Sequence, residues 1–366
     1  MKWAWRVGSI AGIPIYIHST FVLIILWVAW AHASQGAGLA ATLSGIVFIL
    51  ALFGCVVLHE LGHALTARRY GIGTRDITLL PIGGLARLER MPDDPRQEFW
   101  VALAGPAVNV VIAAGLYGVL VLQGRSEPDF QLTITGGPFI ERIMVVNVIL
   151  VAFNMLPAFP MDGGRVLRAI LAMRMEYSRA TQVAATVGQG MALLFALFGL
   201  LYNPFLVFIA LFVWIGATQE SGMVQVRSAL SGIPVARAMI TEFHSIGPEE
   251  PLQNAVALTL STAQRDFPVI EHGEVVGVLT QRELFRALAE DGQLAAVSEV
   301  MNRDFETADS FEMLEPVLQR LQTCDCAMMP VVRGGRLVGI ITADNIGEFL
   351  SIQSAVDGRA GSAASR

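Results

Sequence analysis

The chain has 366 residues, of which 54% are hydrophobic and only 15% are charged, whereas an average soluble domain is about 25% charged. This composition excludes an intrinsically disordered chain and argues against a wholly soluble one. The formal net charge of −6 provides none of the basic surface expected of a nucleic-acid partner, and three cysteines are too few for a disulfide framework.

The charges are unevenly distributed along the chain. Residues 1–222 carry 14 basic and 12 acidic side chains, whereas residues 223–366 carry 11 basic and 19 acidic ones. The first part also contains apolar runs close to the length of a membrane span, which needs roughly 20 residues. We therefore predict a polytopic α-helical membrane domain of about six spans over residues 1–222, followed by a soluble part. The runs cover residues 19–33, 38–65, 99–122, 139–160, 181–201 and 203–219.

The arginines predict the orientation of these spans. Basic segments precede the first run, separate the second from the third, and follow the fourth. All of them lie on one side if the chain crosses six times, and basic loops face the cytoplasm. We expect a multi-pass protein of the cell membrane with both termini cytoplasmic. The basic segment 165–179, which includes Arg168, predicts either an amphipathic helix on the cytoplasmic membrane surface or a solvated loop.

The second apolar run ends in the sequence HELGH over residues 59–63. His59 and His63 lie one helical turn apart on one face, so both imidazoles can bind the same Zn²⁺ ion. Glu60 then lies beside the metal-activated water and can accept its proton. Because ionisable groups inside an apolar span are costly, the motif favours a metal site over two histidines that merely satisfy a helix end.

A catalytic zinc ion needs a third protein ligand and an open position. Asp162 is the natural candidate, because it follows a segment in which Pro157 and Pro160 break the fourth run. Broken helix is tolerated at membrane depth where it lines a cavity. Alone, Asp162 is better explained as a helix cap at the membrane surface. Together with the HELGH motif it predicts one Zn²⁺ ion per chain.

The motif HExxH in one span followed by N-x₂-P-x₄-D-G in a later one resembles the site-2 protease family, intramembrane zinc metalloproteases of peptidase family M50. The resemblance covers most of residues 1–220. It implies that His59, His63 and Asp162 are the zinc ligands. It also implies that Glu60 is the general base and that Asn154 holds the substrate carbonyl or oxyanion. A plainer role for Asn154 is to hold the backbone freed at the helix break.

Three further segments extend this resemblance. The loop with Gly83 and Gly84 is expected to contact an extended substrate strand through its backbone, unless it is a plain surface turn. Gly105 and Asn109, one turn apart, are expected to let helices pack closely and hydrogen-bond across the contact. The family's amino-terminal segment is matched by residues 12–21.

The resemblance also implies the partners and the reaction. The substrate would be a membrane-anchored protein in the lipid bilayer, such as an anti-sigma factor or a sigma precursor. It would be cut by regulated intramembrane proteolysis. Because the predicted topology places the catalytic residues at the cytosolic ends of the second and fourth spans, we expect cleavage toward the cytosolic side of the substrate span.

The second part of the chain contains an internal repeat with a shift of 62 residues. Each copy has a helical stretch, a short strand, a tight hairpin, a second strand and a helix. The pattern resembles a tandem pair of CBS (cystathionine-β-synthase) motifs, an α+β module over residues 234–352. We expect a linker at 223–233 before it and a disordered tail at 353–366 after it. The matched pairs are Met239 and Met301, Pro268 and Pro330, Gly277 and Gly339, and Thr280 and Thr342.

The CBS resemblance leaves two roles open. One is an adenine-nucleotide site that uses Thr280, Thr342 and Asp344, and the other is a structural module that joins chains into a homo-oligomer. Cys324 and Cys326 are expected to be core thiols.

Two functions from different classes remain. One is a zinc endopeptidase with a regulatory or oligomerising CBS pair, and the alternative is a CBS-regulated channel or transporter with an intramembrane metal or ion site. The motif favours the endopeptidase, because an ion pathway has no need of Glu60 between two histidines.

Overall fold

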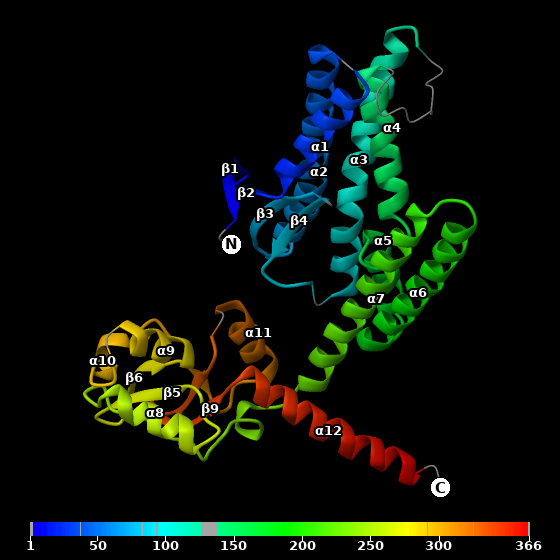
Figure 1. Cartoon of the computed structure of the whole chain (residues 1–366). Helices are drawn as coiled ribbons and strands as arrows, with labels where there is room; N and C mark the ends of the chain where they lie inside the picture. Colours follow the sequence, from blue (N-terminus) through cyan, green and yellow to red (C-terminus); the bar gives the residue numbers. More distant parts are fainter. Residues whose placement is uncertain are drawn as a thin grey trace. The chain divides into compact units, whose positions relative to one another are not determined.

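The computed structural model describes residues 3–36, 38–81, 83–92, 94–125, 138–290, 292–324 and 326–364. The chain divides into two compact units, Met1–Val224 and Gln225–Arg366 (Figure 1). We describe each of them by itself.

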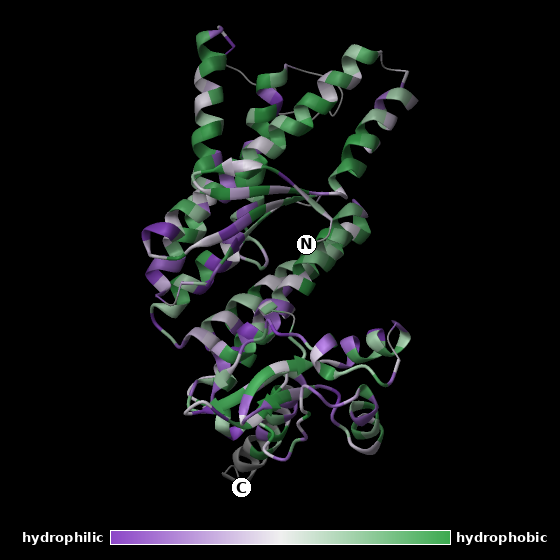
Figure 2. Ribbon diagram, turned by 90° about the vertical axis from the view of Figure 1, so that its left-hand side faces the viewer, coloured by the Kyte–Doolittle hydropathy of each residue, from purple (hydrophilic) through white to green (hydrophobic). Residues whose placement is uncertain are grey.

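The first unit is built mainly from helices, and each of the six predicted spans is helical. Four helices, α2, α3, α6 and α7, are long and apolar enough to cross a membrane, whereas α1 and α4 have 14 and 16 residues. Apolar residues predominate along them (Figure 2). The multi-pass α-helical class is thereby confirmed. The helices are α1 (Phe21–Ser34), α2 (Leu39–Arg69), α3 (Pro95–Leu122), α4 (Phe139–Asn154), α5 (Asp162–Ala172), α6 (Tyr177–Leu201) and α7 (Phe205–Leu230).

The fourth predicted span, residues 139–160, is shorter than expected. Its helix α4 ends at Asn154, and the chain stays outside regular helix until α5 begins at Asp162. Pro157 explains the early end, since a proline disfavours helical backbone at the residue before it and cannot donate the next hydrogen bond.

A four-stranded sheet in this unit was not predicted. Its strands are β1 (Ala4–Ile10), β2 (Ile13–His18), β3 (Thr74–Leu80) and β4 (Gly83–Leu88), in the order β1-β2-β3-β4. The pairs β1–β2 and β3–β4 are antiparallel, whereas β2 and β3 run parallel.

The sheet lies against the helix that carries the HELGH motif. Ile15 and Ile77, paired across β2 and β3, share one buried cluster with Phe53, Val57 and Leu61 of α2. This packing fixes the position of the sheet relative to α2 and leaves β4 as an edge strand next to that helix.

The second unit repeats one pattern twice, as predicted. The hairpin β5 (Phe267–Glu271) and β6 (Glu274–Leu279) recurs as β8 (Met329–Arg333) and β9 (Arg336–Ile341). The remaining elements are the short 3₁₀ helix at Val235–Arg237, α8 (Leu252–Ser261), α9 (Gln281–Glu290), α10 (Val297–Val300), β7 (Ala308–Asp309), α11 (Leu314–Cys324) and α12 (Ala343–Ala364).

The two copies exchange their leading segments. Ile240, at the start of the first copy, forms a β-bridge with Ile340 in the hairpin of the second copy. Likewise Asn302, at the start of the second copy, forms a β-bridge with Val278 in the hairpin of the first. Each hairpin is therefore completed by the other copy, which explains why the repeat folds as a pair.

The tail differs from the prediction. Residues 353–366 were expected to be disordered, but α12 continues to Ala364. The segment up to that residue contains four alanines, which favour helix, and no proline, although Gly358 and Gly361 weaken the helix.

Candidate metal centre

Three buried side chains from two helices meet inside the first unit. His59 and His63 of α2 face Asp162, the first residue of α5. The Asp162 Oδ2 atom lies 3.1 Å from His59 Nε2 and 3.2 Å from His63 Nε2, and the two Nε2 atoms are 3.1 Å apart. Within the part of the chain that the structure describes, this is the one group of three His, Cys, Asp or Glu side chains arranged to hold a metal ion. The structure thus brings together the residues that the two motifs singled out.

The outer nitrogens of both imidazoles are already engaged. His63 Nδ1 lies 2.7 Å from the Val101 carbonyl oxygen, which can only accept, so this nitrogen carries the proton. His59 Nδ1 donates in the same way to Asn109 Oδ1 at 3.3 Å. In the neutral imidazoles both Nε2 atoms then direct lone pairs toward each other and toward the carboxylate of Asp162. Three buried acceptors without a proton between them repel one another unless a cation lies among them.

The donor set fits zinc. Two imidazole nitrogens and one carboxylate oxygen form a ligand set of a catalytic zinc site. With ligand bonds of about 2.0–2.1 Å, tetrahedral geometry requires ligand atoms roughly 3.3 Å apart, close to the separations of 3.1–3.2 Å found here.

One face of α3 supports the centre. Val101, Gly105 and Asn109 follow one another at intervals of four residues and so lie along one side of the helix. A Cβ atom on Gly105 would lie only 2.1 Å from His63 Nε2 and 2.7 Å from His59 Nε2. Glycine is therefore the one residue type that leaves room for the imidazoles and a metal ion.

This arrangement refines the sequence-based interpretation of α3. Gly105 and Asn109 were expected to allow close helix packing and a hydrogen bond across the contact, and both features are present. What the sequence did not reveal is that the hydrogen bond goes to His59. The Gly-Asn pair one turn apart in an apolar run was the only available signal.

Glu60 is held beside the edge strand. Its Oε2 atom accepts a hydrogen bond of 3.1 Å from the Ala86 N–H of β4. A Cβ atom on Gly84 would lie 2.7 Å from Glu60 Cγ, so the backbone of β4 runs directly along α2 here. Strand β4 begins with Gly83 and Gly84. Ile82, which precedes them in the predicted loop, lies outside the described residues.

Asn154 is the last residue of α4 and is half-buried. Among the described residues its side chain makes no hydrogen bond, so its expected role toward the substrate stays a prediction.

Arg168 corrects the expectation of a basic surface helix. Its side chain is 1% exposed and lies in the interior of the first unit. The guanidinium donates from Nε to Glu98 Oε1 of α3 at 2.7 Å and from Nη1 to Glu220 Oε1 of α7 at 2.5 Å. Arg168 can be buried because these two carboxylates, 70 and 52 residues away in the chain, neutralise its charge. In the sequence alone it looks like a surface residue.

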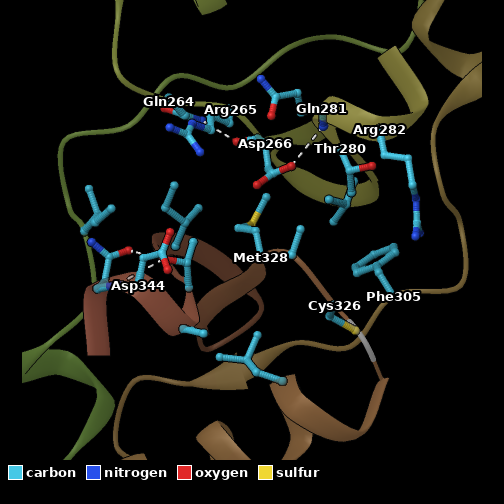
Figure 3. A pocket seen from close by; sticks show the side chains of 18 of the residues that line it. Gln264, Arg265, Asp266, Thr280, Gln281, Arg282, Phe305, Cys326, Met328 and Asp344 are labelled. Carbon is cyan, nitrogen blue, oxygen red and sulfur yellow. Dashed lines mark hydrogen bonds between the residues drawn. The ribbon is translucent and has the colours of Figure 1, made fainter. Parts of the chain in front are cut away.

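The second unit holds a cavity of about 1330 Å³ that both CBS copies line. Thr280, Thr342 and Asp344, the three residues predicted for a nucleotide site, are all part of its wall. Figure 3 shows Asp266, Thr280 and Asp344 around this cavity. Asp266 accepts a hydrogen bond of 3.0 Å from the Gln281 N–H, and burial raises the pKa of its carboxyl group.

Both threonines also cap helices. Thr280 and Glu283 form a reciprocal capping box at the start of α9, in which Glu283 Oε2 accepts from the Thr280 N–H at 3.0 Å and Thr280 Oγ1 accepts from the Glu283 N–H at 3.3 Å. In the second copy, Thr342 Oγ1 accepts from the Asn345 N–H at 3.2 Å and donates to Asn345 Oδ1 at 2.6 Å.

Cys324 and Cys326 line the same cavity. They are joined in a disulfide, so the expectation of core thiols is wrong. The spacing in sequence did not reveal that the two sulfur atoms come together.

Comparisons with known proteins agree with these observations. The profile of peptidase family M50 matches residues 47–135 and 131–197, and that of the CBS domain matches residues 235–290 and 297–351. Zinc metalloprotease MJ0392 of Methanocaldococcus jannaschii is 34% identical over 353 residues, which cover 96% of this chain and 97% of that protein. The chain belongs to peptidase family M50. Zn²⁺ is accordingly the metal that its donor set is built to hold.

Other relatives match parts of this M50 peptidase. The structure of the site-2 protease from Methanocaldococcus jannaschii is 38% identical and covers 60% of this chain and 95% of that one, with a TM-score of 0.45. CBS domain-containing protein YhcV of Bacillus subtilis is 30% identical over 115 residues, which cover 31% of this chain and 81% of that protein. The family match and the four membrane-length helices make the M50 peptidase a multi-pass membrane protein, and the two CBS matches show that it carries a CBS pair.

The space at Gly105 gives a first prediction. We expect Gly105→Ala to lose bound zinc almost completely, because its methyl group occupies the space between the ligands. Gly115→Ala on the same helix is the matched control, since a Cβ atom there meets nothing within 4 Å. The measurement is the zinc content of the purified full chain. One zinc ion per chain in the Gly105→Ala variant would contradict the placement of the centre.

Proposed function

We propose that this M50 peptidase is an intramembrane zinc endopeptidase that hydrolyses peptide bonds within or near the membrane spans of anchored protein substrates. The observation that carries the proposal is the convergence of His59, His63 and Asp162 inside the helical unit, with Glu60 one residue from the first ligand. Ionisable groups are costly at membrane depth, so their convergence indicates function.

The side chains divide the chemistry between them. When bound, zinc would act as a Lewis acid, which polarises the scissile carbonyl and lowers the pKa of a water molecule. His59, His63 and Asp162 hold the ion, and the Val101 carbonyl keeps His63 in the correct tautomer. Glu60 takes the proton from the attacking water and delivers it to the leaving amine.

Asn154 would hold the substrate carbonyl oxygen. Its place at the end of α4, eight residues before Asp162, supports this role by putting it at the same helix break.

Edge strand β4 provides a route for the substrate. A helical substrate hides its carbonyls in hydrogen bonds, so it must be extended before it can be cut. An edge strand offers unpaired backbone groups to such a segment. The Ala86 N–H of this edge already points to Glu60, so a segment paired with β4 passes next to the general base. Gly83 and Gly84 keep the start of the strand free of side chains.

The topology and partners complete the proposal. The arginine distribution supports cytoplasmic termini and cleavage near the cytosolic side of the substrate span. The lipid bilayer surrounds the first unit. A membrane-tethered regulator, such as an anti-sigma factor or a sigma precursor, is the substrate class that the family membership suggests. The CBS pair would regulate the peptidase or join copies into a homo-oligomer.

The cavity of the second unit would take an adenine nucleotide. The carboxylates of Asp266 and Asp344 can accept hydrogen bonds from ribose hydroxyls, and Arg265 and Arg282 in the same wall can bind phosphate. Thr280 and Thr342, whose hydroxyls cap helices, place the helix starts at the cavity wall, where backbone N–H groups can face an anion.

The role of Glu60 gives a second prediction. Glu60→Gln should retain zinc but cleave a single-span substrate about 10²–10⁴-fold more slowly, because the amide cannot accept the proton. Glu176→Gln, which changes an exposed carboxylate at the start of α6, is the matched control and should cleave normally. Purified enzyme and substrate in detergent or vesicles suffice for the assay. Wild-type cleavage rates in a zinc-loaded Glu60→Gln variant would refute the mechanism.

The cavity gives a third prediction. Titration of the full chain with AMP and ATP should show saturable binding, which Asp344→Ala weakens about tenfold through the loss of a charged hydrogen-bond acceptor. Glu249→Gln, an exposed change outside the cavity wall, should bind like wild type. Isothermal titration calorimetry measures both. If wild type binds no adenine nucleotide, the cavity is not a nucleotide site and the structural or dimerising role is favoured.

A further inference from the structure

A second buried charge cluster lies outside the metal centre. Arg168 and Glu98 are 1% and 3% exposed, and Arg168 pairs with Glu98 and with Glu220, whose side chain is 22% exposed. Burying an ion pair is expensive, and replacing such a group with apolar side chains is often neutral or stabilising. The proposed hydrolysis uses none of these three groups, so the cluster calls for another explanation.

The cluster joins the same elements that carry the metal ligands. Arg168 stands on α5, which begins with Asp162, and Glu98 stands on α3, one turn before Val101. The Val101 carbonyl holds His63. The ion pair therefore connects the helix of the third ligand to the helix that orients the second.

The arginine also contacts the segment that leads into Asp162. The ring of Phe159, three residues before Asp162, lies 5.1 Å from the Arg168 guanidinium carbon and is completely buried. Arg168 thus holds the chain on both sides of Asp162. Glu220, on α7, fixes the other edge of the guanidinium.

Asp162 depends on such support more than the histidines do. His59 and His63 lie within a helix of 31 residues, where the backbone fixes their spacing. Asp162 is instead the first residue of an 11-residue helix that follows a non-helical segment, and the residue before it makes no side-chain cap. Its position relative to the histidines is therefore set by whatever anchors α5.

We infer that Arg168 is a positioning residue, whose ion pairs with Glu98 and Glu220 set the position of Asp162 relative to His59 and His63. An arginine suits this role because its planar fork binds carboxylates in fixed directions, whereas apolar packing permits sliding. The inference rests on the proposed zinc site and adds a requirement for its assembly.

The test compares metal binding with folding. We choose Arg168→Lys, which keeps the charge but loses the fork, and Glu220→Gln, which removes one charge at nearly constant size. Arg320→Lys is the matched control, because Arg320 also bridges two carboxylates, Glu306 and Glu312, but in the second unit. For each full-length variant in detergent we measure the zinc dissociation constant, the visible spectrum of the cobalt-substituted protein and the melting temperature.

We expect Arg168→Lys and Glu220→Gln to weaken zinc binding about tenfold or more and to change the cobalt spectrum. Arg320→Lys should lower only the melting temperature. If Arg168→Lys and Glu220→Gln bind zinc as wild type does, with the same cobalt spectrum and only a lower melting temperature, the cluster is merely structural and the inference is wrong.

Two other results are also decisive. If Arg168→Lys does not fold, the milder Glu220→Gln decides by the same criteria. If wild type itself binds no zinc, the proposed function fails. If wild type and both variants bind zinc with the same affinity, only the inference about Arg168 fails.

Discussion

The close contact between α2 and one face of α3 is the constraint on which the first unit depends. Without a side chain at Gly105, the two helices approach until the Val101 carbonyl and the Asn109 amide reach the outer nitrogens of His63 and His59. These bonds settle which ring nitrogen keeps its proton and turn both free lone pairs inward. A larger residue at position 105 would remove the metal position and both supporting bonds together.

The same face of α3 explains how a third ligand arrives from a distant part of the chain. Glu98, one turn before Val101, pairs with Arg168 on α5 and thereby ties that helix to the one that orients the histidines. A hydrophobic contact would stabilise the helices as well but lacks the directed hydrogen bonds that Arg168 donates to Glu98. The edge strand β4 positions Glu60, because the Ala86 N–H donates a hydrogen bond to its carboxylate. The zinc ligands, the proposed general base and the proposed substrate strand are thus positioned by different elements around one helix.

Sequence reasoning succeeded where the signal was local or repeated. The HELGH motif sets two ligands by helical periodicity, and Asp162 followed from a helix break with two prolines. The 62-residue repeat predicted both hairpins of the second unit, since matched residues occupy matched strands. Sequence reasoning failed where the residues that contact each other are far apart in the chain. Strands β2 and β3 pair in parallel across more than fifty residues, and Arg168 was misread as a surface residue because Glu98 and Glu220 lie on other helices.

X-ray absorption at the zinc edge of the purified full chain tests the central claim most directly. A centre made by His59, His63 and Asp162 predicts a first coordination shell of nitrogen and oxygen only, near 2.0–2.1 Å, with the outer-shell scattering of two imidazoles. Asp162→Ala should lose the carboxylate contribution while the two imidazoles remain. A spectrum with sulfur at about 2.3 Å, or with fewer than two imidazoles in the wild-type protein, would contradict the account.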